Sequence, residues 1–278
     1  EDIYYYICYN YYYLGEYDSL EEFINAYQHV IYSNPILKIK IGFIQAPIFC
    51  IKNEKEKAIN LLEELNNLIL QEENNSNLLK DYYICAANCY YLINNIKKAK
   101  EMINKAELKK DDFQSVPYFM EIYLLQAKFA LYEKQYNLSL SWTNKGITLC
   151  ENFYNLRYLS DFYYITALNL FYLKNYNSTL SYLKKASKLK EELNHKFDLG
   201  IIRYYEAFTL FKLGNFSQSI TKTYKAAHIF KVLDAKQYYK ESQLLLIKTE
   251  FELRNYERGF YLLRSLSKEY ELTTLEKE

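Results

Sequence analysis

Glycine and proline are scarce in this sequence of 278 residues, which contains only 6 Gly and 3 Pro. Strand-rich folds need both residues in turns at short intervals, so their scarcity favours helices joined by brief connections. The same scarcity leaves no glycine-rich loop that could hold a phosphate group. Long apolar runs are also lacking, and we expect no signal peptide. A membrane-spanning helix is therefore not expected.

An excess of either charge is lacking as well, since 35 Lys and Arg face 34 Asp and Glu. Proteins that bind nucleic acids usually carry a basic excess or a basic patch, because contacts with phosphates dominate their affinity. We therefore expect residues 1–278 not to contact DNA themselves.

The cysteines are odd in number, and no two of them form a CxxC pair, a spacing typical of zinc-binding and redox sites. Cys85 and Cys89 lie four residues apart and could form a metal or redox pair. Burial as small hydrophobic residues is the simpler interpretation. The sequence predicts a reduced, cytoplasmic protein without a metal or cofactor. The five cysteines are Cys8, Cys50, Cys85, Cys89 and Cys150.

No catalytic arrangement is evident among the histidines. His29, His195 and His228 lie at unrelated positions, and no Ser-His-Asp or Cys-His pattern accompanies them. The sequence therefore predicts no catalytic residues and a protein that is not an enzyme.

An internal repeat of about forty residues runs through the sequence. Seven windows of fourteen residues align without gaps, among them "LKNYNSTLSYLKKA" (173–186) and "LGNFSQSITKTYKA" (213–226). The fourth residue of each window is usually an aromatic ring, and a short polar residue precedes it. Successive fourth residues are 38, 41, 40, 40, 40 and 40 positions apart: Tyr17, Lys55, Ile96, Tyr136, Tyr176, Phe216 and Tyr256.

Small side chains recur at two fixed positions of the repeat. Such positions let two helices approach closely, while larger apolar residues three or four positions away fill the remaining space. One position lies three residues after the ring and is occupied by Ala58, Ala99, Ser139, Thr179, Ser219 and Gly259. The other lies nine residues before the ring and is occupied by Cys8, Ala46, Ala87, Ala127, Ala167 and Ala207, with Ile247 as the exception.

These positions resemble the tetratricopeptide repeat, a pair of helices that stacks into arrays. The resemblance covers the whole chain, although the family's usual period is about 34 residues and its closing proline is missing here. It implies an all-α fold, a right-handed α-solenoid of about seven helix pairs. We expect residues 1–278 to form one array that turns near residues 15, 53, 95, 135, 175, 215 and 255.

The tyrosine-rich stretch "YYYICYNYYYLGEY" (4–17) is then the first helix of the first repeat and its turn. It is too short to span a bilayer. Because the sequence begins with Glu1 inside a helical pattern, we expect an N-terminal output domain to be missing. The motif "TTLE" (273–276) predicts the start of one more helix.

The first helix of each pair is expected to line the inner face of the array, where rings with a few amides and ammonium groups suit an extended peptide. An asparagine can pair with a peptide's N–H and C=O together, and a lysine can meet a carboxylate. Core packing is the alternative role for any single ring. The candidate peptide-binding residues are Tyr5, Tyr9, Asn88, Tyr91, Lys128, Tyr164, Asn169, Phe171, Tyr204 and Phe208.

Connections such as "KLKEELNHKFDLG" (188–200) and "IFKVLDAKQYYKES" (229–242) resemble the Rap/Rgg/NprR/PlcR/PrgX superfamily of peptide-sensing regulators. That resemblance implies a short signalling peptide bound in the concave groove and an N-terminal output module. The module would be a DNA-binding helix-turn-helix or a bundle acting on a response regulator. It also implies a homodimer through the C-terminal repeats, where "YERGFYLLRSL" (256–266) offers an apolar stripe.

The sequence thus predicts the sensor part of a cytoplasmic bacterial or phage quorum-sensing-type regulator of transcription. Two alternatives stay open. One is a generic tetratricopeptide scaffold for protein–protein interaction. The other is a Rap-like phosphatase or inhibitor of a response regulator.

Overall fold

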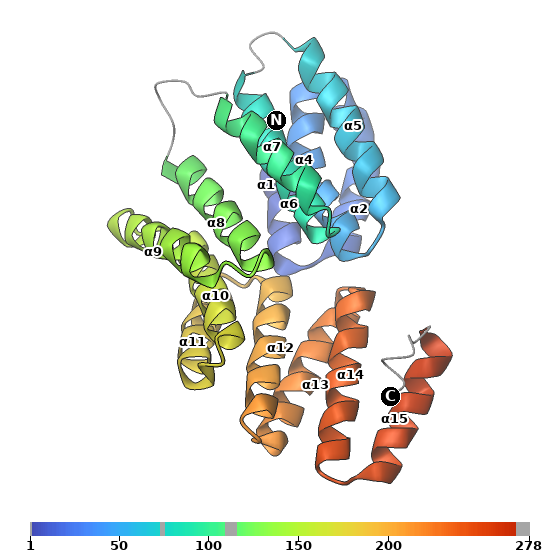
Figure 1. The fold of residues 1–278 in the computed structure, drawn as a ribbon. Helices are drawn as coiled ribbons and strands as arrows, with labels where there is room; N and C mark the ends of the chain where they lie inside the picture. The colour runs from blue at the N-terminus through green and yellow to red at the C-terminus, as the bar shows by residue number, and fades with distance from the viewer. Residues whose placement is uncertain (1, 73–75, 109–115, 271–278) are drawn as a thin grey trace. The chain divides into compact units, whose positions relative to one another are not determined.

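The structure, a computed structural model, describes residues 2–72, 76–108 and 116–270 (Figure 1). It divides into two compact units, residues 1–154 and 155–278, which are described separately. The single continuous array expected from the sequence stays a prediction. The motif at residues 273–276 lies outside the described residues.

The described part of the first unit is built of helices only. Each long helix packs against the next one in the chain, in the pairs α1–α2, α4–α5, α6–α7 and α8–α9. The helices are α1 (Asp2–Leu14), α2 (Tyr17–Ala26), α3 (Gln28–Ser33), α4 (Pro35–Ile51), α5 (Lys55–Gln71), α6 (Ser76–Leu92), α7 (Ile96–Leu108), α8 (Val116–Tyr132) and α9 (Tyr136–Asn152).

Three more pairs make up the described part of the second unit. The first members α10, α12 and α14 form one layer, and the second members α11 and α13 each pack between two of them. We call the first members A helices and the second members B helices. The helices are α10 (Leu156–Tyr172), α11 (Tyr176–Glu192), α12 (Lys196–Lys212), α13 (Phe216–Val232), α14 (Lys236–Glu252) and α15 (Tyr256–Glu269). This pairing confirms the predicted all-α, tetratricopeptide-like solenoid class.

The short helix α3 was not predicted. The B helix of the first pair ends at Ala26 and the chain resumes as α3, so that the first repeat contains three helices. Asn34 then begins α4, because its side-chain Oδ1 accepts a hydrogen bond from the Leu37 N–H at 2.9 Å. An N-cap of this kind satisfies a backbone donor that the first turn of a helix leaves unpaired.

A single left-handed residue ends each A helix. In the first pair this residue is Gly15, with φ of +70°, and the Glu16 N–H bonds back to the Tyr11 carbonyl at 2.9 Å. This is the hydrogen bond of a Schellman cap, which satisfies carbonyls at a helix end. The same cap recurs at Asn53, Asn94, Lys134, Lys174, Gly214 and Arg254. The polar turn seen in the sequence is therefore a helix cap followed at once by the next helix.

The small positions lie where the paired helices touch. The A-helix residues from Cys8 to Ala207 are fully buried, and Ile247 is 4% exposed. In two pairs the B-helix residue bonds directly to the A-helix backbone. The Ser139 hydroxyl donates to the Ala127 carbonyl at 2.8 Å, and the Ser219 hydroxyl donates to the Ala207 carbonyl at 2.9 Å. The predicted close approach at these positions is confirmed.

We expect Ala167→Leu to destabilise the protein by about 1–3 kcal/mol, because the added carbons have no space at a fully buried contact between helices. Urea unfolding measures the change. Ala26→Leu, at an exposed position of α2, is the matched control and should change the free energy of unfolding by less than about 0.5 kcal/mol. Equal effects from the two substitutions would contradict the assigned register.

Candidate functional site

In the first unit, three of the predicted peptide-binding residues lie together. Asn88 and Tyr91 belong to α6, and Lys128 occupies the register position of Asn88 on α8. The Lys128 ammonium donates to the Asn88 Oδ1 at 3.4 Å and lies 5.5 Å from the centre of the Tyr91 ring. The Asn88 amide donates to the Ile84 carbonyl at 3.3 Å. An amide, a ring and a cation thus share one partly exposed surface.

Helix α1 presents its tyrosines as a continuous row of rings. The ring centres of Tyr5 and Tyr9 are 5.8 Å apart, and the Tyr9 hydroxyl donates to the Tyr13 hydroxyl at 3.0 Å. The ammonium of Lys40, from α4, lies 5.9 Å from the centre of the Tyr5 ring. Tyr5 and Tyr9 are half-buried, so each ring packs on its neighbours and still reaches solvent.

In the second unit, three of the predicted rings contact Tyr205, and a fourth, Phe208, contacts two of those three. The Tyr164 and Tyr205 ring centres are 5.8 Å apart, and those of Phe171 and Phe208 are 5.1 Å apart. The ring centres of Tyr204 and Phe208 are 6.2 Å apart. These residues come from α10 and α12, which are neighbouring A helices. We call this group the aromatic cluster: Tyr164, Phe171, Tyr204, Tyr205 and Phe208.

Burial keeps two hydroxyl groups of the aromatic cluster neutral. It raises the pKa of Tyr204 and the pKa of Tyr205 well above the usual range of tyrosine, and the nearby Glu241 carboxylate acts in the same direction. A neutral phenol can donate a hydrogen bond as well as accept one. The cluster therefore combines apolar ring faces with hydroxyl donors.

Tyr205 was not among the residues predicted from the sequence. It lies two residues before the small Ala207, whereas the predicted rings lie three residues before, or one or four residues after, a small position. Its aromatic ring was the only feature that could have identified it, and this feature is not distinctive because the sequence contains 33 Tyr.

Asn169 is not placed for direct contact with a ligand. Its side chain is fully buried, and its Nδ2 donates to the Ile165 carbonyl of the same helix at 2.9 Å. It lies two residues after Ala167, and a helix turns by about 100° per residue, so Asn169 lies off the face that carries Leu168. We therefore leave Asn169 out of the proposed site.

A hollow of about 450 Å³ lies elsewhere, on α8 and α9 of the first unit. It is shallow and open to solvent, and none of the ten predicted residues lines it. Its lining residues are Tyr123, Asn144, Lys145, Thr148, Leu149 and Asn152.

A buried group of charges ties three helices of the second unit together. Lys190 of α11 is 3% exposed and contacts Asp161 of α10 and Asp198 of α12, each at 2.5 Å. His195 precedes α12, and its Nδ1 lies 3.2 Å from the Asp198 carboxylate. Burial disfavours the charged form of Lys190, but the two carboxylates outweigh it and raise the lysine's pKa. We call Lys190, Asp161, Asp198 and His195 the ion cluster.

All five cysteines are free thiols in the structure. Burial raises the pKa of Cys8 to about 11, which agrees with its role as a small packed residue. Within residues 2–72, 76–108 and 116–270, no group of His, Cys, Asp or Glu has the geometry of a metal site. None of the helices described there is both long enough and apolar enough to cross a bilayer.

Comparisons with known proteins show which solved structures have a similar fold. No family model and no curated protein matches the sequence. Solved structures do match. A Rap protein complexed with Competence and Sporulation Factor gives a TM-score of 0.71 at 14% identity, covering 96% of this chain and 76% of that chain. The apo quorum sensor NprR from B. thuringiensis gives a TM-score of 0.58 at 11% identity, covering 97% of this chain and 77% of that chain.

Aspartyl phosphate phosphatase F from Bacillus subtilis gives a TM-score of 0.57 at 14% identity, covering 92% of this chain and 75% of that chain. Because all three identities are low, the likeness concerns the fold. The chain is a tetratricopeptide-like α-solenoid of the kind found in Rap and NprR, which confirms at the level of fold the resemblance stated from the sequence.

The ion cluster predicts a dependence of stability on pH. Burial lowers the pKa of His195 despite the opposing charge of Asp198, with Lys190, Asp161 and Arg157 also nearby. Below pH about 6.5 the unfolded histidine takes up a proton more readily than the folded one, so stability falls as the pH falls. Between pH 7.5 and 5.5 we therefore expect His195 to contribute a loss of stability.

Urea unfolding at the two pH values measures this loss. His195→Gln should reduce the difference in the free energy of unfolding between the two pH values, whatever its effect on stability at pH 7.5. His228→Gln, on the exposed surface of α13, is the control and should leave the difference intact. If His195→Gln keeps the wild-type pH dependence, the buried histidine is not its source.

Proposed function

We propose that this chain is the peptide-sensing part of a cytoplasmic, quorum-sensing-type regulator of a bacterium or phage. A short signalling peptide binds along the A helices and switches an N-terminal output module that regulates transcription. The observation that carries this proposal is the partly exposed rows of rings on the A helices, within a fold like that of the quorum sensor NprR. The proposal gives this chain no catalytic step and no cofactor.

The chemistry of these surfaces suits an extended peptide. In the first unit, the Asn88 amide can pair with a peptide bond, and Tyr91 offers a ring face beside it. The Lys128 ammonium currently contacts the neutral Asn88 Oδ1 at 3.4 Å. A carboxylate is a stronger acceptor for an ammonium than an amide is, so the peptide's C-terminus would replace this contact.

In the second unit, the aromatic cluster would hold apolar side chains of a peptide. Tyr164, Tyr204 and Phe208 are partly exposed, while Phe171 is 7% exposed and supports the others. Rings bury a large area and lose little side-chain freedom, which makes them effective contact residues. A ligand that contacts one arrangement of the helix pairs better than another shifts the population toward it, and this shift would be the signal.

Lys128→Met should weaken the binding of short apolar peptides with a free C-terminus by about tenfold, because a charged hydrogen bond is lost. Isothermal titration calorimetry with a pool of such peptides, and with the same pool amidated at the C-terminus, measures the change. Amidation should weaken binding to the wild-type protein about equally and should have no further effect on Lys128→Met.

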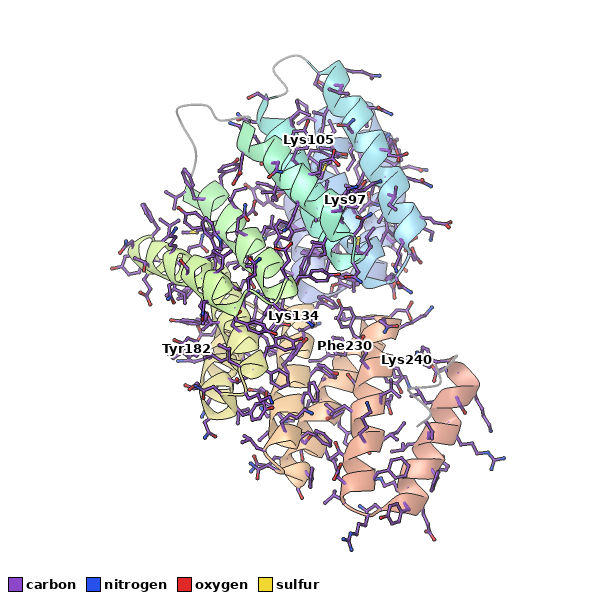
Figure 2. All side chains as sticks on the ribbon, viewed as in Figure 1. Lys97, Lys105, Lys134, Tyr182, Phe230 and Lys240 are labelled. Carbon is purple, nitrogen blue, oxygen red and sulfur yellow. The ribbon has the colours of Figure 1, made fainter. Side chains whose placement is uncertain are left out.

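The matched control is Lys134→Met, an exposed lysine in the turn after α8 (Figure 2). It should bind both pools as the wild-type protein does. If no peptide of either pool binds while the circular dichroism spectrum stays helical, the proposal fails. If amidation has no effect on the wild-type protein, Lys128 does not bind the carboxylate.

A Rap-like role as a phosphatase or inhibitor of a response regulator is the second candidate. The likeness in fold to aspartyl phosphate phosphatase F supports it. Reading the gene upstream of the codon for Glu1 separates the candidates. A helix-turn-helix there favours transcriptional regulation, and a helical bundle favours action on a response regulator.

We also propose that two copies associate through α15. Its surface carries Phe260 and Tyr261, which are 62% and 74% exposed, and Tyr256, which is 54% exposed. Exposed rings gathered on one helix are typical of an interaction surface.

Replacing both Phe260 and Tyr261 by serine should convert a dimer into a monomer, because the rings would no longer be buried between copies. Sedimentation velocity measures the assembly state. Tyr32→Ser, at a ring 54% exposed in the first unit, should leave the dimer intact. A wild-type protein that sediments as a monomer would contradict the assignment.

A further inference from the structure

Positive charge is concentrated in one of the two units, although the whole chain is nearly neutral. In residues 155–278, Lys and Arg outnumber Asp and Glu by 20 to 14, whereas in residues 1–154 they are outnumbered by 20 to 15. Such asymmetry between two parts of a chain points to a charged partner for one of them.

The excess lies on the B helices of the second unit. Helix α13 contains no Asp or Glu, and α11 contains only Glu191 and Glu192, at its C-terminal end. Glu191 pairs with Arg203 at 2.8 Å, so it neutralises a cation of α12. The exposed cations of α11 and α13 are called the basic face here: Lys184, Lys185, Lys188, Lys225 and Lys231.

The repeat places these cations on a common surface. Lys185 and Lys225 are forty residues apart and hold the same position on successive B helices. Each B helix packs against the A-helix layer, and residues of equal register in stacked repeats point the same way. The exposed side chains at this register therefore point away from the A helices that carry the aromatic cluster.

Most of the basic face is not neutralised by the protein. Within residues 155–270, Lys184, Lys185, Lys225 and Lys231 form no ion pair, and Lys188 has only a long contact of 3.9 Å with Glu192. The Lys185 ammonium lies 5.1 Å from the centre of the Tyr182 ring, which Figure 2 labels on α11. Tyr224, 42% exposed, lies at the register of Lys184 on α13. Rings thus accompany the cations.

We propose that the basic face docks an acidic helical surface of a partner protein. Lys184 and Lys188 are one helical turn apart, a rise of about 6 Å, which matches two carboxylates four residues apart on a partner helix. The half-buried Tyr182 and the exposed Tyr224 supply the aromatic contacts that protein interfaces favour. The chain as a whole carries a formal net charge of +1 and lacks the basic excess that is usual in proteins that bind DNA.

The docking surface is separate from the proposed peptide site, since it uses B helices and the peptide site uses A helices. Binding of the two partners can therefore be measured independently. Loss of docking with intact peptide binding would locate the partner on the basic face.

Fluorescence anisotropy with a labelled helical peptide that carries Glu at every fourth position tests the proposal. We expect binding at low salt that weakens steeply as added salt screens the charges. Replacing Lys184, Lys185 and Lys225 together by Glu should weaken binding by at least about tenfold. The triple control replaces Lys97, Lys105 and Lys134, exposed lysines of the first unit (Figure 2). It changes the net charge equally and should alter affinity less than about twofold.

Three results would overturn the proposal. One is equal binding of the same peptide with every Glu replaced by Gln. Another is an equal loss of binding in both triple variants, which would indicate a general effect of net charge. The third is tighter binding of single-stranded oligothymidylate, lost in the Lys184, Lys185 and Lys225 variant alone, which would identify a nucleic-acid surface. Thermal unfolding followed by circular dichroism verifies that each variant is folded.

Discussion

The close contact of two small side chains within most of the helix pairs is the constraint on which the rest of the structure depends. Where Ser219 donates to the Ala207 carbonyl, the backbone of one helix touches a side chain only two heavy atoms long on the other. A larger residue there would separate the helices. The Schellman caps fit the same geometry, because each ends one helix and lets the next begin within two residues.

The repeated contact leaves two kinds of surface with different chemistry. The A helices carry rings, an amide and the Lys128 ammonium, and neighbouring A helices bring those groups within a few ångströms of one another. The B helices of the second unit carry exposed lysines with few acidic neighbours. The ion cluster around Lys190 fixes the second unit from within, where charges satisfy one another and are unavailable to a partner. One repeat thus supports an aromatic surface and a charged surface on separate layers.

Much of the fold was predictable because it follows from spacing along the chain. The pairs α10–α11, α12–α13 and α14–α15 repeat at forty residues, and their small positions are buried as the register requires. Helix α3 was not predictable from that register, since it depends on where α2 stops. The peptide-binding residues stay a prediction. The sequence named Tyr164 and Phe208 but could not show which side chains meet, because a shift of two residues moves a side chain about 200° around a helix. The structure buries Asn169 and brings Tyr205 into the aromatic cluster.

The sequence alone determined the helix pairs, their turns and the identity of the small contact residues, because these depend on the order and size of side chains along one helix pair. Only the tertiary structure decided which groups meet across neighbouring pairs. The contact of Lys128 with Asn88, the aromatic cluster and the burial of Lys190 between two aspartates join residues that are far apart in the chain or lie on different helices. Their distances depend on how one pair is rotated and shifted against the next, and packing sets that rotation.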